Sequence, residues 1–239
     1  MVVHGSRGDR RERADRILDT GRDLLLSWGY RRVTIDELAR RAGVGKGTIY
    51  LHWRSREEVF HAVSAREAAA MAEAIVDAVR KDAVEVALHR YLRRLFVEAM
   101  KRPVLRALYT RDADTLGTFL AAAHHQRLEQ SKLGVNRDYL GVLAAESMLR
   151  PDLRLTDLDY TLPTIVFGFF AAEPFHAPTI TLTLEQKADQ LADTVRRAFE
   201  PPEPPSSAAV KRAAEKALPI LQRLARDFRT ATYGDDEDD

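Results

Sequence analysis

The sequence predicts an all-α protein in which a small N-terminal three-helix domain precedes a larger helical domain. Apolar residues recur at helical spacing along almost the whole chain, and no convincing strand-like alternation is present. The length of 239 residues suits a short module joined to a larger one, and a hydrophobic content of 45% supplies a sizeable core. We therefore expect two helical units.

The N-terminal unit is expected to follow a basic arm over residues 1–12 and to occupy residues 13–60. One helical face is formed by Ile17, Gly21, Leu24, Leu25 and Trp28, and the next by Ile35, Leu38, Ala39 and Ala42. Thr34 and Glu37 have the spacing of a capping box at the start of this second helix, and Gly43 is expected to cap its end.

The second unit is expected to cover residues 61–200. A capping box at Ser55 and Glu58 predicts a long helix that runs to Ala78 and connects the two units. Another helix is expected to stop near Pro103, with one or two shorter helices over 103–133 and a further one over 139–149. Pro163 is expected to start or kink a helix, and Thr183 with Gln186 to open one that reaches Phe199.

The C-terminal residues predict three further segments. A Pro-rich linker covers 201–207, an extra helix covers 208–233, and an acidic tail covers 234–239. We expect the extra helix to pack on the helical domain or across a dimer.

The charge is uneven along the chain although the formal net charge is only +1. Residues 1–62 hold 13 Lys and Arg against 9 Asp and Glu, whereas the remaining residues hold 24 against 27. This asymmetry would draw a phosphate backbone to the N-terminal end.

Several classes of function are disfavoured by what the sequence lacks. It has no cysteine and no His-x-x-x-His spacing, so we expect neither a metal nor a cofactor. It has no nucleophile elbow and no phosphate-binding glycine loop, so we expect no enzyme. No apolar run reaches the ~18 residues of a membrane span, and the charged N-terminus lacks the apolar core of a signal peptide. We therefore expect a cytoplasmic protein.

The segment TIDELARRAGVGKGTIYLHWRS, residues 34–55, has the pattern of a helix-turn-helix. A second helix that enters a major groove keeps an apolar inner side and a small or polar outer side. Ile49 and Trp53 are expected to face inward. The residues expected to face outward are Lys46, Gly47, Thr48, Tyr50 and His52.

Residues 17–63 resemble the DNA-binding domain of the TetR/AcrR family of bacterial regulators. The resemblance implies that phosphates are held by Thr34, Lys46, Thr48, Tyr50 and Arg56, and that base edges lie nearest Val44, Gly45, Gly47, Leu51 and His52. The sequence departs from the family pattern at Gly45, where a Ser or Thr is frequent, at Trp53 in place of Phe, and at Arg56 in place of Lys. An arm formed by Arg7, Arg10, Arg11 and Arg13 would reach into a minor groove.

The resemblance also implies a homodimer on a palindromic operator of double-stranded DNA and a small hydrophobic effector. Candidates for lining the effector pocket are Phe96, Met100, Tyr109, Phe119, Tyr139, Met148 and Phe170. Candidates for the dimer interface are Leu162, Ile165, Val166, Phe169, Leu191, Val195 and Phe199. Each of these side chains can equally belong to the ordinary core.

The resemblance favours a homodimeric transcriptional regulator, a repressor that its effector releases from DNA. One alternative is a helix-turn-helix regulator without a small-molecule ligand, controlled by a protein partner or by its own abundance. Another is a helical scaffold or enzyme that merely retains the N-terminal unit.

Overall fold

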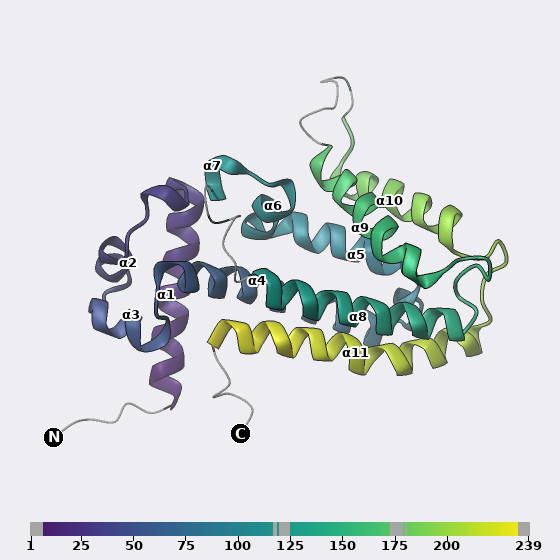
Figure 1. The fold of residues 1–239 in the computed structure, drawn as a ribbon, viewed down its shortest axis with the longest axis horizontal. Coiled ribbons are helices and arrows are strands. Elements are labelled where there is room, and N and C mark those ends of the chain that lie inside the picture. The colour runs from purple at the N-terminus through teal and green to yellow at the C-terminus, as the bar shows by residue number, and fades with distance from the viewer. Residues whose placement is uncertain (1–6, 117–118, 120–124, 173–178, 180, 234–239) are drawn as a thin grey trace.

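The computed structural model describes residues 7–116, 119, 125–172, 179 and 181–233 (Figure 1). Within these residues every regular element is helical, which confirms the predicted all-α class. The molecule is elongated, with three N-terminal helices gathered at one end and the longer helices forming the rest (Figure 1). Among the described residues, no helix is both long enough and apolar enough to cross a membrane.

The small unit at this end, which we call the head, consists of the first helices and one 3-10 turn. Its elements are α1 (Arg7–Trp28), η1 (Tyr30–Arg32), α2 (Ile35–Ala42) and α3 (Lys46–His52). Gly29 ends α1 with a φ of 74°, a left-handed conformation in which glycine is not strained. A side chain at Gly29 would also collide with the Asp114 carbonyl, because a Cβ built there lies 2.6 Å from that oxygen.

The helical domain contains the remaining elements. They are α4 (Arg56–Lys81), η2 (Ala83–Val86), α5 (Leu88–Lys101), α6 (Pro103–Thr110), α7 (Ala113–Leu116), α8 (His125–Ala145), α9 (Leu155–Ala171), α10 (Leu184–Phe199) and α11 (Ser207–Tyr233). The C-terminal helix α11 packs along α4 and α8, and α10 packs against α5 (Figure 1). The extra C-terminal helix therefore lies on the helical domain of its own chain.

Two hydrophobic cores meet on α4. Val59, Phe60 and Val63 belong to the core of the head, whereas α4 residues from Ala68 onward belong to the core of the helical domain. The head core also takes in side chains from beyond α5, among them Phe119, whose ring lies 5.3 Å from that of Tyr30. Because α4 is one uninterrupted helix through both cores, it connects the head to the helical domain mechanically.

Three details differ from the sequence-based expectations. Residues 7–12, assigned to an arm, form the first turns of α1, whereas residues 1–6 and the tail 234–239 lie outside the described residues. The helix expected over 139–149 ends at Ala145, because the chain turns there and Ser147 adopts a φ of 56°. Of the two alternatives expected for Pro163, the start of a helix is excluded, because Pro163 lies inside α9.

Candidate functional site

The helix-turn-helix is held in place by local capping. The Thr34 hydroxyl oxygen accepts a hydrogen bond from the Glu37 amide at 3.2 Å, and the Ser55 hydroxyl oxygen does the same for Glu58. Gly43 closes α2 with a φ of 66°, as predicted for this position. These signals set where α2 begins and ends and where α4 begins.

The capping box at Thr34 is only half formed, because Glu37 has other partners. Its carboxylate accepts hydrogen bonds from Arg40 and Arg41, at 3.0 and 2.7 Å from the two Nε atoms. These bonds lower the pKa of Glu37 to about 2. The two arginines therefore stabilise the exposed side of α2 through Glu37.

Helix α3 has two clearly different faces. Ile49 and Trp53 are buried, as predicted. On the opposite side Lys46 and Gly47 are exposed, and the side chains of Tyr50 and Leu51 are 51% and 77% exposed. Helix α3 therefore has an inner face that packs in the core and an outer face that is open to solvent.

The other residues predicted to bind DNA lie around this face. Gly45 is the exposed N-cap of α3, and Val44 and Thr48 beside it are partly buried. Lys46 forms an ion pair with Asp36 of α2, although both side chains remain more than half exposed. The structure thus brings α2, the turn and α3 into one continuous surface.

Arg56 is used differently from the other predicted phosphate ligands. Its guanidinium donates a hydrogen bond to the Val33 carbonyl oxygen at 3.0 Å and lies 4.3 Å from the centre of the Tyr30 ring. The Tyr30 hydroxyl in turn donates to the Glu57 carboxylate at 2.7 Å. The Arg56 side chain therefore joins the start of α4 to the loop before α2.

His52 lies where α3 meets the first turns of α1. The pKa of His52 lies below its ordinary value of 6.5, mainly because the ring is partly buried and also because Arg10 and Arg13 carry positive charges nearby. The ring is therefore neutral at pH 7, with one nitrogen able to donate and the other to accept. The residues assigned to a basic arm thus contribute positive charge beside α3 from within a helix.

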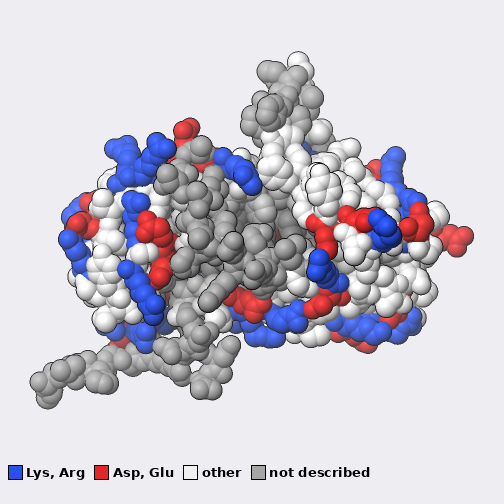
Figure 2. Space-filling view, in the orientation of Figure 1, with Lys and Arg blue, Asp and Glu red and all other residues white. Residues whose placement is uncertain are grey.

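The head presents a surface rich in positive charge. Lys and Arg side chains are spread over the end of the molecule where α1, α2 and α3 lie, interrupted by Asp and Glu (Figure 2). This distribution agrees with the surplus of basic residues counted over residues 1–62. A polyanion approaching the head would therefore meet an attractive field.

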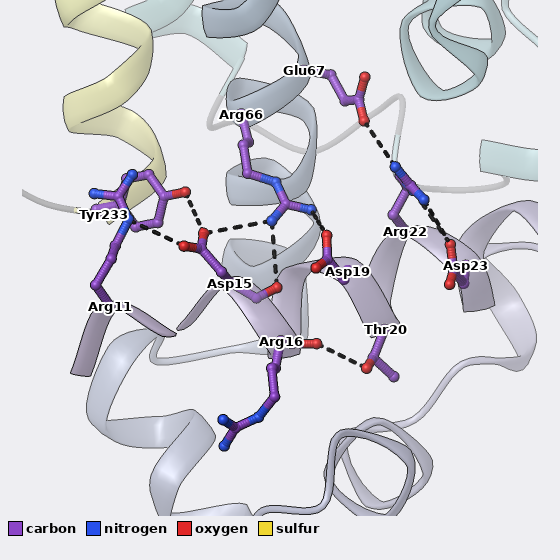
Figure 3. Close-up of polar contacts among 10 residues, drawn as sticks. All are labelled: Arg11, Asp15, Arg16, Asp19, Thr20, Arg22, Asp23, Arg66, Glu67 and Tyr233. Atoms are coloured by element: carbon purple, nitrogen blue, oxygen red, sulfur yellow. Dashed lines mark hydrogen bonds and ion pairs between the residues drawn. The ribbon is translucent and has the colours of Figure 1, made fainter. Parts of the chain in front are cut away.

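The C-terminal end of α11 is fastened to the head. The Trp53 indole donates a hydrogen bond to the Thr232 carbonyl oxygen at 3.3 Å, and the Tyr233 hydroxyl donates to the Asp15 carboxylate at 2.6 Å. The Arg11 guanidinium lies 3.3 Å from the centre of the Tyr233 ring (Figure 3).

A second set of contacts holds α1 against α4. Arg66 of α4 pairs with Asp19 at 2.7 Å and with Asp15 at 3.6 Å (Figure 3). Asp15 is therefore shared by both sets. Sequence reasoning missed the α11 contacts because their partners are 179 and 218 residues apart and no local pattern marks them.

A cavity of about 440 Å³ lies inside the helical domain, between α4, α5, α6, α8, α9 and α11. Of the residues predicted to line a pocket, the structure brings Tyr109, Tyr139 and Phe170 to it. The other four, Phe96, Met100, Phe119 and Met148, are not in its lining. Phe96 and Met148 are buried in the core of the helical domain, Phe119 lies in the head core, and Met100 lines a separate shallow pocket beside Pro103.

Sequence reasoning missed most of the polar lining of this cavity. Tyr91, Arg111 and Asn136 lie on three different helices or helix ends, and only the packing of those helices places them around one space. Leu221, Leu224 and Phe228 of α11 complete the wall. The helix that is fastened to the head therefore also contacts the cavity.

The residues predicted to form a dimer interface separate into two groups. Leu191, Val195 and Phe199 are buried inside the chain, where α10 packs on α5, so they are not on a free surface. Leu162 and Val166 line the cavity, and Ile165 and Phe169 are partly buried. The exposed large apolar residues on α9 are instead Leu155, Tyr160 and Phe167, at 38%, 77% and 44% exposed.

Residues 17–63 match the model of the family described as bacterial regulatory proteins, tetR family. The uncharacterized HTH-type transcriptional regulator TtgW of Pseudomonas putida is 35% identical over 57 residues, which are 24% of this chain and 42% of that protein. The HTH-type transcriptional regulator SrpR of Pseudomonas putida is 37% identical over 54 residues, 23% of this chain and 25% of that protein. The chain thus spans less than half the length of these curated relatives.

The likeness of fold extends further than the likeness of sequence. A solved structure from Rhodococcus sp., assigned to the TetR family of transcriptional regulators, superposes with a TM-score of 0.58 at 18% identity. The superposition covers 78% of this chain and 98% of the other, so it includes the helical domain as well as the head. The head over residues 17–63 thus matches the tetR family of bacterial regulatory proteins, and the chain as a whole has the fold of this solved structure.

Proposed function

We propose that the protein is a homodimeric transcriptional regulator, a repressor that a small molecule bound in the helical domain releases from a palindromic DNA operator. The observation that carries the proposal is the outer face of α3, where Lys46, Tyr50 and Leu51 are exposed while Ile49 and Trp53 are buried behind them. Side chains that point outward from a helix of this kind can contact DNA in the major groove.

The DNA-binding roles follow from the chemistry of each position. Phosphates are held by Thr34, Lys46, Thr48, Tyr50 and Arg56, and the base edges lie nearest Val44, Gly45, Gly47, Leu51 and His52. The Thr34 hydroxyl accepts a bond from Glu37 but keeps its own proton to donate to a phosphate oxygen. Arg56 contributes least, because its guanidinium already binds Val33 and packs on Tyr30.

Base readout in this arrangement comes mainly from the far end of α3. Gly45 and Gly47 have no side chains and let the backbone approach DNA closely, but they offer no hydroxyl or amide group to a base. Leu51 can contact a thymine methyl group, and the neutral His52 ring can donate or accept a hydrogen bond. Arg10 and Arg13 beside His52 add attraction to the nearby phosphates.

A homodimer is proposed because a single helix-turn-helix reads too few bases for useful specificity, whereas two heads on a two-fold axis read a palindrome. Two of the exposed apolar residues of α9, Tyr160 and Phe167, together with the partly buried Ile165 and Phe169, offer a surface for the second copy. This surface replaces the buried α10 side chains in the proposed interface.

Two helices offer a route from the effector to the head. Met71, Ala72 and Ile75 of α4 line the cavity, and the same helix carries Val59 and Phe60 in the head core. Helix α11 lines the cavity with Leu221 and Leu224 and holds the head through its last turn. An effector that binds one arrangement of these helices more tightly will shift the population of head positions.

The test starts with selection of the genomic fragments that the purified protein binds, followed by fluorescence anisotropy on the selected site. Tyr50→Ala and Lys46→Ala should each weaken binding about tenfold while the circular dichroism and melting temperature stay unchanged. Arg80→Ala is the matched control, since Arg80 is an exposed cation paired with Asp77 at the far end of α4. DNA affinity that survives in both variants, or failure to retain any fragment at low salt, refutes the proposal.

A further inference from the structure

The cavity in the helical domain has unpaired polar groups in an otherwise apolar wall. Tyr139 is satisfied, because its hydroxyl donates to the Val86 carbonyl oxygen at 2.7 Å. The hydroxyl of neighbouring Tyr91, a side chain only 5% exposed, has no hydrogen-bond partner within the described part of the chain, and neither has the Asn136 amide. These polar groups line the cavity, so its wall differs from that of a packing defect, which would be apolar.

The state of the Tyr91 hydroxyl at neutral pH follows from its surroundings. Burial, with a smaller contribution from Tyr109, raises the pKa of Tyr91 above its ordinary value. The group therefore stays protonated and can donate a hydrogen bond. The cavity thus offers donors to a molecule that carries acceptor atoms.

The charged groups of the lining are Arg111 and Asp159, and they differ in their partners. Asp159 forms an ion pair with Arg137 at 2.6 Å. Arg111 has no carboxylate partner among the described residues, and its guanidinium lies 5.5 Å from the centre of the Phe167 ring. The lining of the cavity therefore carries one positive charge that no acidic group among the described residues offsets.

The position of Arg111 is defined by the backbone. The residue caps α6 with a φ of 51°, and its amide donates a hydrogen bond to the Leu108 carbonyl oxygen at 3.3 Å. Two other arginines of the same domain, Arg150 and Arg154, are each paired with an aspartate, at 2.7 and 3.0 Å. Arg111 thus differs from comparable arginines both in lining the cavity and in lacking an acidic partner within the described chain.

We propose that this cavity binds a small amphipathic carboxylic acid, with its apolar body among the aromatic side chains and its carboxylate on the Arg111 guanidinium. A guanidinium binds a carboxylate through two parallel hydrogen bonds, whereas it repels an ammonium group. The cavity volume of about 440 Å³ lies within the range of small-molecule sites. The assignment rests on the proposed function in taking this cavity as the effector site.

The test compares three probes of equal chain length by isothermal titration calorimetry on the purified full chain: sodium decanoate, 1-decanol and decylamine. Decanoate should bind at least about tenfold more tightly than decanol, the effect of one charge-assisted hydrogen bond, and decylamine most weakly. Arg111→Gln should remove the preference for decanoate over decanol, and Arg111→Lys should keep part of it. Arg154→Gln, a paired arginine outside the lining, is the control and should bind as the unmodified chain does.

Three results would overturn the assignment: decylamine binding as tightly as decanoate, an unchanged preference in Arg111→Gln, or no binding of any probe. DNA binding is measured separately on the same preparations without probe. If DNA is bound but decanoate is not, the proposed ligand class is wrong, whereas the proposed role as a DNA-binding regulator is retained. If decanoate binds with the expected preference but the protein binds no DNA, the proposed function is wrong, whereas the proposed carboxylate site is retained.

Discussion

Helix α3 and the cavity of the helical domain depart in opposite ways from the usual arrangement of apolar residues inside and polar residues outside. On α3, the apolar side chain of Leu51 and the ring of Tyr50 face water. In the cavity, the Tyr91 hydroxyl, the Asn136 amide and the Arg111 guanidinium line an apolar space without protein partners among the described residues.

Each departure lies where the proposed function needs a partner molecule. DNA would cover the exposed groups of α3, and an effector would satisfy the groups in the cavity. The remainder of both regions is ordinary: Ile49 and Trp53 are buried behind α3, and Tyr139 is hydrogen-bonded beside the cavity. Substituting a buried or hydrogen-bonded residue and its exposed or unpaired neighbour therefore distinguishes a structural role from a binding role.

The largest expected effect tests the two faces of α3. Trp53→Ala should lower the free energy of unfolding by about 3–5 kcal/mol, because it removes a buried indole and its hydrogen bond to Thr232. Leu51→Ala should change it by less than about 0.5 kcal/mol, since Leu51 is mostly exposed. Urea denaturation followed by circular dichroism measures both, and equal losses would contradict the division of α3 into a core face and a contact face.

A smaller effect should distinguish the two tyrosines of the cavity. Tyr139→Phe should lower the free energy of unfolding by about 1–2 kcal/mol, because it leaves the buried Val86 carbonyl unpaired. Tyr91→Phe should leave it unchanged or raise it slightly, since its hydroxyl loses no protein partner. Thermal and chemical unfolding of the two variants side by side provide the comparison. A larger loss in Tyr91→Phe would mean that this hydroxyl is structurally satisfied and would remove it from the binding groups.

The hydrogen bond that attaches α11 to the head should contribute about 1 kcal/mol to the free energy of unfolding. Tyr233→Phe removes the hydrogen bond to Asp15 and nothing else, so the free energy of unfolding should fall by about that amount. Tyr50→Phe is the matched control, because it deletes a hydroxyl of the head that has no partner among the described residues. Amide hydrogen exchange of α1 should also increase in Tyr233→Phe alone; if protection there is unaltered, the last turn of α11 does not hold the head.

The smallest expected effect concerns the other end of α11. Glu146, a buried carboxylate, accepts hydrogen bonds from Lys216 at 2.6 Å and Arg212 at 2.8 Å, and these bonds lower its pKa below the ordinary 4.5. The charged carboxylate therefore stabilises the fold fully above about pH 4.5, and this contribution is lost as the pH falls through the lower pKa of the folded state.

Glu146→Gln should consequently make the unfolding free energy less dependent on pH below about 4.5, measured by urea titrations between about pH 3 and 6. Glu203→Gln, an exposed residue of the Pro-rich linker, serves as the control. An identical pH profile in Glu146→Gln and the unmodified chain would show that the ion pairs with α11 do not contribute in solution.

The sequence by itself determined the all-α class and the local structure of the head, because the signals for these act within a few residues. Thr34, Gly43 and Ser55 cap helices through bonds to groups no more than four positions away, and the alternation of Ile49 and Trp53 with Tyr50 and Leu51 sets the two faces of α3. The same local patterns predicted the capping box at Thr183 and Gln186, which is complete in the structure.

The tertiary structure alone decided which side chains meet across distant helices. An apolar stripe has the same spacing whether its helix packs inside the chain, as Leu191 and Val195 do, or faces a partner, so periodicity could not separate the two. Arg111 and Tyr91 share a cavity because α5, α6 and α9 pack together, and Trp53 meets Thr232 because α11 lies along α4 as far as the head. Such contacts depend on how whole helices pack, which no local spacing encodes.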